Sequence, residues 1–244
     1  MAKRRRRSIV SDNPHVAEMQ KAFEHHRYYQ DVGKSFEECL EIWAIELLAT
    51  TGMCSDELLA RYKKIVESLS GIERSEIEQL SIMLTQAVVF ELERGGPRDI
   101  LGELYEGLDI TNGHIGQYFT PNNVCELMSQ MAFTGDVAAQ VEKTGYISVY
   151  DPAVGSGRML LAFTKCVEAD GSIDYHKHVY MEAIDIDIRC VWMTFIQLSM
   201  YGIPARVFHG NALSSAPKTV WRTPDYIFGR WEEKIYPPES GSES

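Results

Sequence analysis

A glycine-rich turn is the part of this sequence whose residue types and spacing point most directly to chemistry. The stretch YISVYDPAVGSGRMLLAF covers residues 146–163. Its first residues are β-prone, Gly155-Ser156-Gly157 forms a turn of small residues, and a helix is expected to begin near Arg158. A strand, a glycine turn and a helix bring a ligand close to free backbone N–H groups at the helix N-terminus. Because any tight strand-to-helix turn favours glycine, the turn alone leaves ligand binding and simple chain reversal equally open.

The charge distribution argues against a stand-alone domain that binds duplex DNA. The chain of 244 residues has a net charge of −11, although Lys3–Arg7 is a run of five cations. Removing these five from the 24 basic residues leaves 19, against 35 acidic residues. Affinity for duplex DNA depends on neutralising phosphates, so only the basic tail is suited to that contact. A solvated, disordered tail is the other interpretation of the same run.

The composition predicts a globular, cytoplasmic protein. Hydrophobic residues make up 45% of the chain and charged residues 24%, which is ordinary for this class. No apolar run approaches the roughly 18 residues of a membrane helix, and no signal peptide is expected at the N-terminus. The cysteines are scattered without CxxC spacing, which is typical of reduced thiols. The five cysteines are Cys39, Cys54, Cys125, Cys166 and Cys190.

The elements that must position the glycine turn fall into two regions. Over residues 16–108 the spacing of apolar residues predicts four or five helices packed as a bundle. Ser35 and Ser75 are each followed three residues later by Glu, a capping-box pattern that predicts a helix start at both places. From Tyr146 onward, short β-rich and helical runs alternate, which predicts a parallel sheet with crossover helices. We expect the fourth strand at residues 225–229, DYIFG.

Four segments occur in a fixed order in the second half of the chain. They read DILGELYEGL from Asp99, GQYFTPNNVCELM from Gly116, YDPAVGSGRML from Tyr150, and AIDIDIRCVWMTFIQLSMYGI followed by FHGNAL from Ala183. Together they resemble the N6-adenine DNA methyltransferase family, and most closely the modification subunits of type I restriction systems. The resemblance covers roughly residues 98–229, and FTP together with DPAVGSG at this separation is its most specific part.

The resemblance implies an α/β fold. The expected architecture is a class I methyltransferase (Rossmann-like) parallel sheet, truncated after the fourth strand and preceded by an α-helical bundle region. The expected segments are a disordered basic tail (1–14), an N-terminal helical region (15–112), an S-adenosylmethionine-binding methyltransferase-like domain (113–236) and a polar tail (237–244).

The resemblance also implies S-adenosylmethionine as the cofactor, lying across the carboxyl ends of the first strands. Asp151 would accept from the amino group of the methionine part, and Asp185 would accept both ribose hydroxyls because a carboxylate has two acceptor oxygens. Ile186 would cover an adenine face, and Asn211 would contact the ring. The expected cofactor-binding residues are Tyr118, Phe119, Thr120, Pro121, Asp151, Ala153, Gly155, Ser156, Gly157, Asp185, Ile186 and Asn211.

Several of these residues have a second, purely structural interpretation. Thr120 is expected to cap a helix that has Pro121 as its first residue, which would place Phe119 against the methionine part, but Phe119 could equally be core. Asp151 could simply cap a turn, and Asp187 is expected to be a helix N-cap rather than a ligand. No metal site is expected, because neither His114 nor His209 stands in a metal-ligand spacing.

The catalytic motif of the family is degenerate in this sequence. The family places Asn, Asp or Ser, then Pro-Pro and an aromatic residue, after the fourth strand to hold a flipped adenine. The corresponding residues are Arg230, Trp231, Glu232 and Glu233. The prolines are absent, and a guanidinium has no acceptor for the adenine amino group. We also expect the further strands that complete the family's catalytic domain to be absent, and the catalytic residues are unknown.

Three functions remain open. The first is an S-adenosylmethionine-binding protein of the DNA adenine-N6 methyltransferase family that does not methylate by itself and acts as a partner, sensor or regulator in a restriction-modification or other mobile system. The second is an active, site-specific DNA adenine-N6 methyltransferase, completed by a partner subunit or by unusual acceptor residues such as Trp231 and Glu232. The third is a methyltransferase for a non-DNA substrate. The expected partners are DNA, through a partner subunit or the tail Lys3–Arg7, and a second copy or another protein that covers the edge of the fourth strand.

Overall fold

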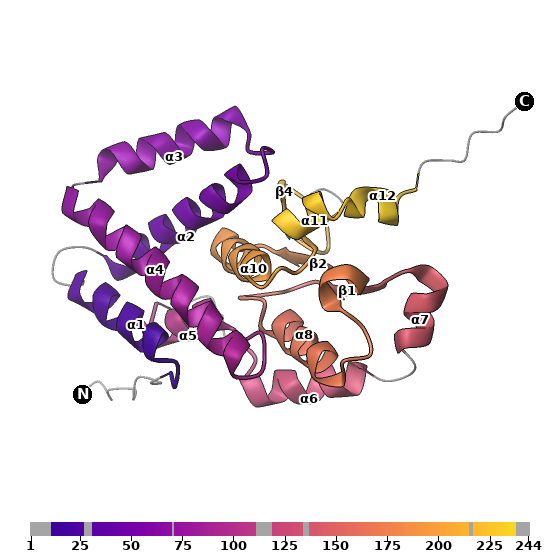
Figure 1. The fold of residues 1–244 in the computed structure, drawn as a ribbon. Helices are drawn as coiled ribbons and strands as arrows, with labels where there is room; N and C mark the ends of the chain where they lie inside the picture. Colours follow the sequence, from indigo (N-terminus) through magenta and orange to yellow (C-terminus); the bar gives the residue numbers. More distant parts are fainter. Residues whose placement is uncertain are drawn as a thin grey trace, which may run out of the picture.

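The chain folds into an α-helical region followed by an α/β region (Figure 1). The computed structural model describes residues 11–26, 31–69, 71–110, 119–133, 137–214 and 217–237. Some predictions fall outside these ranges and are not tested by the structure. They concern the basic run Lys3–Arg7, the cofactor residue Tyr118, His114 and the boundary between residues 112 and 113.

The helical region contains five helices in its described part, as the spacing of apolar residues predicted. They are α1 (Pro14–His26), α2 (Val32–Ala49), α3 (Asp56–Ser68), α4 (Gly71–Glu93) and α5 (Ile100–Gly107). Residues 11–14, which the sequence placed in a disordered tail, are instead anchored. Buried Asn13 accepts from the His15 amide at 3.1 Å and donates to Glu91 at 2.7 Å, so it caps α1 and joins it to α4.

Both predicted capping boxes are wrong. Helix α2 begins at Val32, because the Asp31 carboxylate accepts from the Gly33 amide at 2.9 Å and caps the helix four residues before Ser35. Helix α4 begins at Gly71, so Ser75 also lies inside a helix. A Ser followed by Glu three residues later therefore does not by itself determine where a helix begins.

The second region contains a sheet of four strands in the order β1-β2-β3-β4. The first three strands are parallel, as predicted, and β4 is antiparallel to β3. The strands are β1 (Ile147–Asp151), β2 (Val179–Asp185), β3 (Ala205–His209) and β4 (Thr219–Arg222). The helices are α6 (Asn122–Ala132), α7 (Val137–Thr144), α8 (Arg158–Asp170), α9 (Tyr175–His178), α10 (Ile188–Met200), α11 (Pro224–Phe228) and α12 (Trp231–Ile235). No helix in the described ranges is both long and apolar enough to cross a membrane.

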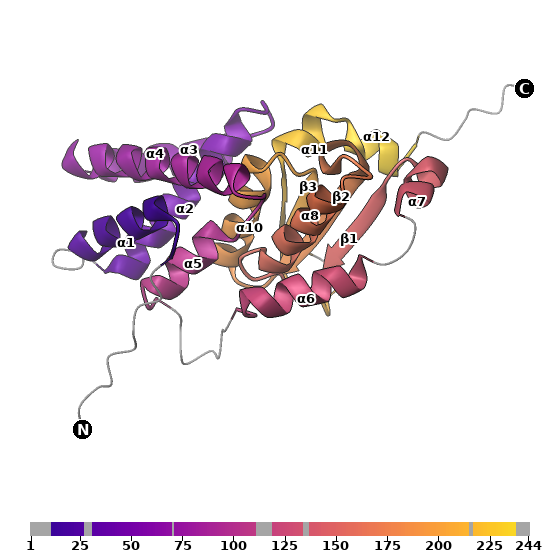
Figure 2. The ribbon, with the colours of Figure 1, turned by 60° about the horizontal axis from the view of Figure 1, so that its bottom comes forward.

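Helices cover the two faces of the sheet unequally. Helices α8 and α10 pack on one face, and α6 packs beside α8 (Figure 2). Successive strand residues point to opposite faces, so Met181 joins the main core whereas its neighbour Tyr180 packs with Tyr226 and Trp231 of α11 and α12. The short C-terminal helices therefore cover only part of the second face.

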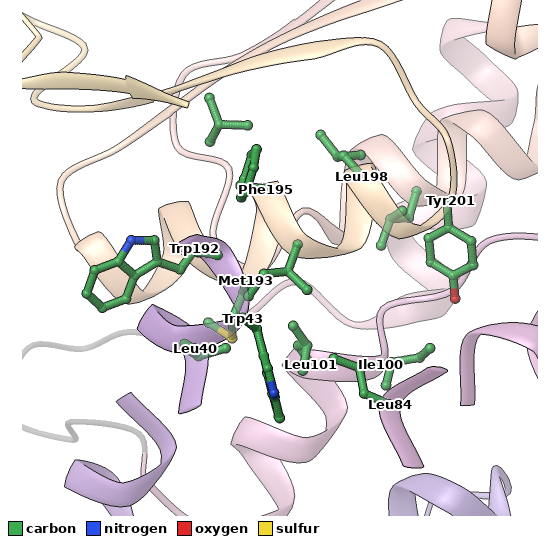
Figure 3. Packing of buried hydrophobic residues seen from close by; sticks show 14 of the residues in the cluster. Leu40, Trp43, Leu84, Ile100, Leu101, Trp192, Met193, Phe195, Leu198 and Tyr201 are labelled. Carbon is green, nitrogen blue, oxygen red and sulfur yellow. The ribbon is translucent and has the colours of Figure 1, made fainter. Parts of the chain in front are cut away.

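The helical region and the sheet region share one hydrophobic core. Helix α2 packs against α10, with Leu40 and Trp43 from α2 lying near Met193 from α10 (Figure 3). Trp43 also donates its indole N–H to Ser81 of α4 at 2.7 Å. The glycine turn that precedes α8 therefore belongs to the same packed unit as the N-terminal helices.

The predicted fourth strand is wrong. Residues 225–229 lie in and just after helix α11, and the observed fourth strand is Thr219–Arg222. The reason is local: Thr223 caps the helix by accepting from the Tyr226 amide at 3.3 Å, and Pro224 stands in the first turn, where its missing N–H costs nothing. The sequence prediction gave the apolar run more weight than this helix start.

Candidate functional site

The glycine turn between β1 and α8 has the backbone shape that excludes side chains. Gly155 has φ 57° and Gly157 has φ 93°, a region that L-residues rarely adopt. A Cβ atom on Gly155 would lie 3.1 Å from two ring carbons of Phe119. Glycine at position 155 therefore keeps open a narrow space between the turn and the FTP segment.

The Asp185 carboxylate lies at the carboxyl end of β2, directly beside this turn. One of its oxygens accepts from the Gly155 amide and the other from the Asp187 amide, both at 2.9 Å. Each oxygen has a second lone pair, so the carboxylate can still accept from a ligand. Burial is the largest influence on this group and raises the pKa of Asp185.

Asp151 lies at the corresponding end of β1, adjacent to β2. Its carboxylate accepts from the Ala153 amide at 3.0 Å, so the turn-capping role is real. Burial raises the pKa of Asp151 as well. Because β1 and β2 are parallel neighbours, the two carboxylates come together at one end of the sheet.

These groups line a cleft of about 760 Å³, within the size range of small-molecule sites. Eight of the predicted cofactor residues lie in its wall: Phe119, Thr120, Asp151, Ala153, Gly155, Ser156, Asp185 and Ile186. Pro121, Gly157 and Asn211 do not line it. The Asn211 side chain accepts from the Leu213 amide at 2.9 Å and so caps its own turn. Its predicted contact with a ligand stays a prediction.

Sequence reasoning missed several residues of the cleft wall. They are Cys125, Val154, Arg158, Met159, Asp187, Ile188, Arg189 and His209. Six of these could have been anticipated from the sequence, because Val154, Arg158 and Met159 lie in or directly after the glycine turn, and residues 187–189 directly follow Ile186. Cys125 and His209 come from chain segments whose approach depends on the fold. Among the described residues, no group of three or more His, Cys, Asp or Glu side chains is placed to hold a metal ion.

The predictions for the two helix starts near the cleft had different outcomes. Asp187 caps α10 by accepting from the Arg189 amide at 3.0 Å, as predicted. Helix α6 begins at Asn122 with Pro121 as its N-cap, so the prediction of Thr120 as N-cap is wrong by one residue. Pro121 has extended ψ and no capping side chain, so no N-cap side chain bonds the first backbone N–H groups of α6.

A buried carboxylate, Asp99, connects the glycine turn to the helical region. It is 2% exposed, caps α5 by accepting from the Gly102 amide at 2.9 Å, and accepts from the Ser156 hydroxyl at 2.6 Å. It also accepts from the Arg158 Nε at 2.6 Å and from the Gln197 amide at 3.0 Å. One side chain thus ties together α5, the turn, α8 and α10.

The segment expected to carry the catalytic motif lies far from this cleft. Trp231 is 1% exposed and packs against Tyr146 and Tyr180, at ring-centroid distances of 5.7 and 6.1 Å. Tyr180 lies near the amino end of β2, five residues before Asp185, which corresponds to roughly 16 Å along a strand. Trp231 therefore faces the end of the sheet opposite the cleft.

Replacing Asp99 by Asn should destabilise the protein strongly. The neutral Asn side chain would leave Arg158 without one of its charge partners. Its NH₂ group would also face the four donors that now bond the Asp99 carboxylate. Removing one member of a buried ion pair costs about 3–5 kcal/mol. The free energy of unfolding in urea, compared with wild type, measures this loss.

Asp109→Asn is the matched control, because Asp109 is exposed and its positive φ of 54° is one that Asn also tolerates. A loss for Asp99→Asn no larger than that of the control would contradict the importance of this carboxylate.

Comparison with known proteins now identifies the family. The sequence profile of the N-6 DNA methylases matches residues 96–232, more than half of this chain. No curated protein sequence matches this chain. A crystal structure from Listeria monocytogenes, assigned as a class I S-adenosylmethionine-dependent methyltransferase, is similar with a TM-score of 0.40 and 15% identity, over 84% of this chain and 55% of that one. The chain thus spans about half the length of that structure, and a TM-score this low carries no argument. From the profile match, this α/β chain belongs to the N-6 DNA methylase family, whose cofactor is S-adenosylmethionine.

Proposed function

We propose that this chain binds S-adenosylmethionine but does not methylate DNA by itself. One observation carries the proposal. The cleft lies at the carboxyl end of the sheet, whereas Trp231, in the segment 230–233 where the sequence predicted the family's acceptor motif, lies at the other end. The chain would then act as a partner, sensor or regulator in a restriction-modification or related system of the cytoplasm. Its free cysteines suit that compartment.

The residues of the cleft fit the parts of the cofactor. Asp185 would accept from the ribose hydroxyls with the lone pairs that its backbone contacts leave free. Asp151 would accept from the amino group of the methionine part. Ile186 is 68% exposed, so its apolar side chain is free to cover an adenine face. Bound in this way, the cofactor would supply a methyl group on a sulfonium.

The charges of the cleft also suit a cationic ligand. Its arginines are committed to carboxylates: Arg158 to Asp99, and Arg189 to Asp187 at 2.6 Å. Asp151 and Asp185 have no cationic partner among the described residues, and each bonds only backbone amides. The local excess of negative charge favours the sulfonium and ammonium groups of S-adenosylmethionine.

The residues at 230–233 have structural roles that oppose catalysis. Arg230 pairs with Glu233, and the Glu232 carboxylate accepts from the Tyr226 hydroxyl at 2.6 Å. Trp231 is buried, so its ring has no free face for a base. This placement supports a non-catalytic, cofactor-binding protein rather than a methyltransferase in which Trp231 and Glu232 form an unusual acceptor site.

A second candidate function is an active DNA adenine-N6 methyltransferase completed by a partner. One observation favours it: β1 is an edge strand whose only described neighbour is β2, and it ends at Asp151 in the cleft. A strand added parallel to β1 would place its own carboxyl end next to the proposed cofactor site. DNA would then be bound through the partner, or with help from the tail Lys3–Arg7.

The exposed edge leads to a proposal about assembly. Tyr150 of β1 is 59% exposed, and α6 exposes Val124, Leu127, Met128 and Met131 at helical spacing. We infer that a second copy of this chain or a partner protein covers this surface. The edge in question is β1, rather than the DYIFG segment that the sequence suggested.

Purified protein should bind S-adenosylmethionine with a Kd on the order of micromolar, as measured by titration calorimetry. Asp185→Ala should weaken binding by about 1–3 kcal/mol, because ribose hydroxyls would lose a buried acceptor. Asp170→Ala, at an exposed aspartate on α8, serves as control.

The affinity for S-adenosylmethionine should also depend on pH. Burial raises the pKa of Asp151 and Asp185, so these carboxylates take up protons at a higher pH than ordinary aspartates. Affinity should therefore fall as the pH drops through those raised values. No binding at millimolar ligand would refute the proposed cofactor site.

The chain alone should transfer no tritiated methyl groups to unmethylated genomic DNA. Placing Asn-Pro-Pro-Phe at 230–233 should not rescue transfer, because this segment lies at the wrong end of the sheet. An active adenine methyltransferase in the same assay is the positive control. Sustained incorporation by the wild-type chain, lost on Asp151→Ala, would favour the second candidate function instead.

Light scattering at micromolar concentration should detect a dimer, since no second strand among the described residues pairs with β1, and α6 exposes apolar side chains. Leu127→Glu on α6 should weaken the dimer, whereas Met53→Glu, at a position 63% exposed in the helical region, should not. A stable monomer that also fails to bind a dye for apolar surfaces would count against both kinds of partner.

A further inference from the structure

The Arg158 side chain joins chain segments that are far apart in sequence. Its Nε donates to Asp99 at 2.6 Å, and its two terminal nitrogens donate to Glu106 at 2.8 Å and to the Thr120 carbonyl at 3.0 Å. The side chain is only 8% exposed. Burial, the largest influence, opposes its charge, but the carboxylates of Asp99 and Glu106 hold the pKa of Arg158 above its usual value.

The Thr120 carbonyl, which accepts one of these hydrogen bonds, belongs to a short segment without regular secondary structure. Phe119 and Thr120 precede α6, which has no side-chain cap at its N-terminus. The Phe119 ring lies 5.6 Å from the Arg158 guanidinium carbon and 5.6 Å from the Tyr105 ring. The position of this short segment against the glycine turn therefore depends on Arg158, on the Tyr105 ring and on a weak bond from the Cys125 thiol to the Thr120 carbonyl at 3.6 Å.

This segment forms the part of the cleft wall that lies against the glycine turn. Phe119 and Thr120 both line the cleft, and the nearest atoms to a Cβ built on Gly155 belong to Phe119. The resemblance to the family implies that this segment lies against the methionine part of the cofactor. Asp185 and Ile186 line the cleft from the end of β2, and the hydrogen bonds of Asp185 to the Gly155 and Asp187 amides do not involve Phe119 or Thr120.

We propose that Arg158 is a positioning residue for cofactor recognition: it holds Phe119 and Thr120 in place against the glycine turn and so shapes the half of the cleft that takes the methionine part. This inference rests on the proposed function, which assigns the methionine part to Asp151 and the adenosine part to Asp185 and Ile186. Lysine cannot replace the arginine, because its single ammonium group lacks the planar fork that reaches three acceptors in different directions.

The test compares two ligands on the full chain. S-adenosylmethionine has both halves of the cofactor, and 5′-methylthioadenosine has only the adenosine half. Arg158→Lys should weaken S-adenosylmethionine at least tenfold in calorimetric Kd, while the Kd for 5′-methylthioadenosine changes by less than twofold. A purely structural role would weaken both ligands together, so the ratio of the two Kd values is the decisive quantity.

Arg206→Lys is the matched control. Arg206 is also a largely buried arginine, 11% exposed, that pairs with a carboxylate, Glu182, at 3.1 Å, but it does not line the cleft. This variant should leave both Kd values, and therefore their ratio, unchanged.

Phe119→Ala provides a second route to the same segment if Arg158→Lys does not fold. It should reproduce the selective loss of S-adenosylmethionine, and Phe119→Leu should restore most of it. In the double variant the two losses should not add, because both residues act on one segment.

Equal weakening of the two ligands by Arg158→Lys, or no change in either, would overturn the inference while leaving the cofactor site standing. Equal weakening by Phe119→Ala would overturn it in the same way. If the wild-type chain binds neither ligand, the proposed function itself fails and the inference fails with it.

Discussion

The buried Asp99 carboxylate is the contact on which the rest of this structure depends. A carboxylate taken out of water is costly unless donors surround it, and here the donors come from α5, the glycine turn, α8 and α10. No single segment supplies enough of them. The cleft therefore takes its shape only when the N-terminal helices have docked against the sheet, and the helical region is a structural part of the cleft rather than an appendage.

Local signals in the sequence predicted the backbone around the glycine turn well. The glycine turn needs positive φ at Gly155 and Gly157, which only glycine adopts freely, so the residue type reveals the geometry. Asp185 ends a β-rich run, and Asp187 stands where a helix begins, so the positions of both residues in the fold could be predicted from their neighbours in sequence. The parallel order of the first strands follows from the alternation of β and α runs.

What the sequence could not predict depends on contacts between distant residues or on competition between local signals. The Asp99 network joins residues separated by up to 98 positions, and no periodicity marks such a pairing. Arg158 was visible beside the turn, but its partners Glu106 and Thr120 lie on segments whose approach is a property of the whole fold. At residues 225–229 the apolar run favours a strand, whereas Thr223 and Pro224 favour a helix start. A helix forms here because Thr223 is held in place as its cap: its hydroxyl also accepts from the amide of Ala205, the first residue of β3, at 2.8 Å.

The position of Trp231 links this fold to the question of catalysis. Its ring packs with Tyr146, Tyr180 and Tyr226 and so closes the amino end of the second sheet face. Acceptor chemistry needs an exposed ring at the carboxyl end, beside Asp151. One short segment cannot occupy both places, and moving it would expose a buried aromatic cluster. A second strand beside β1 could supply acceptor groups without disturbing that cluster, since it would use an edge that is free among the described residues. Under the proposed function, catalysis would therefore need an addition to β1 rather than a repair at residues 230–233.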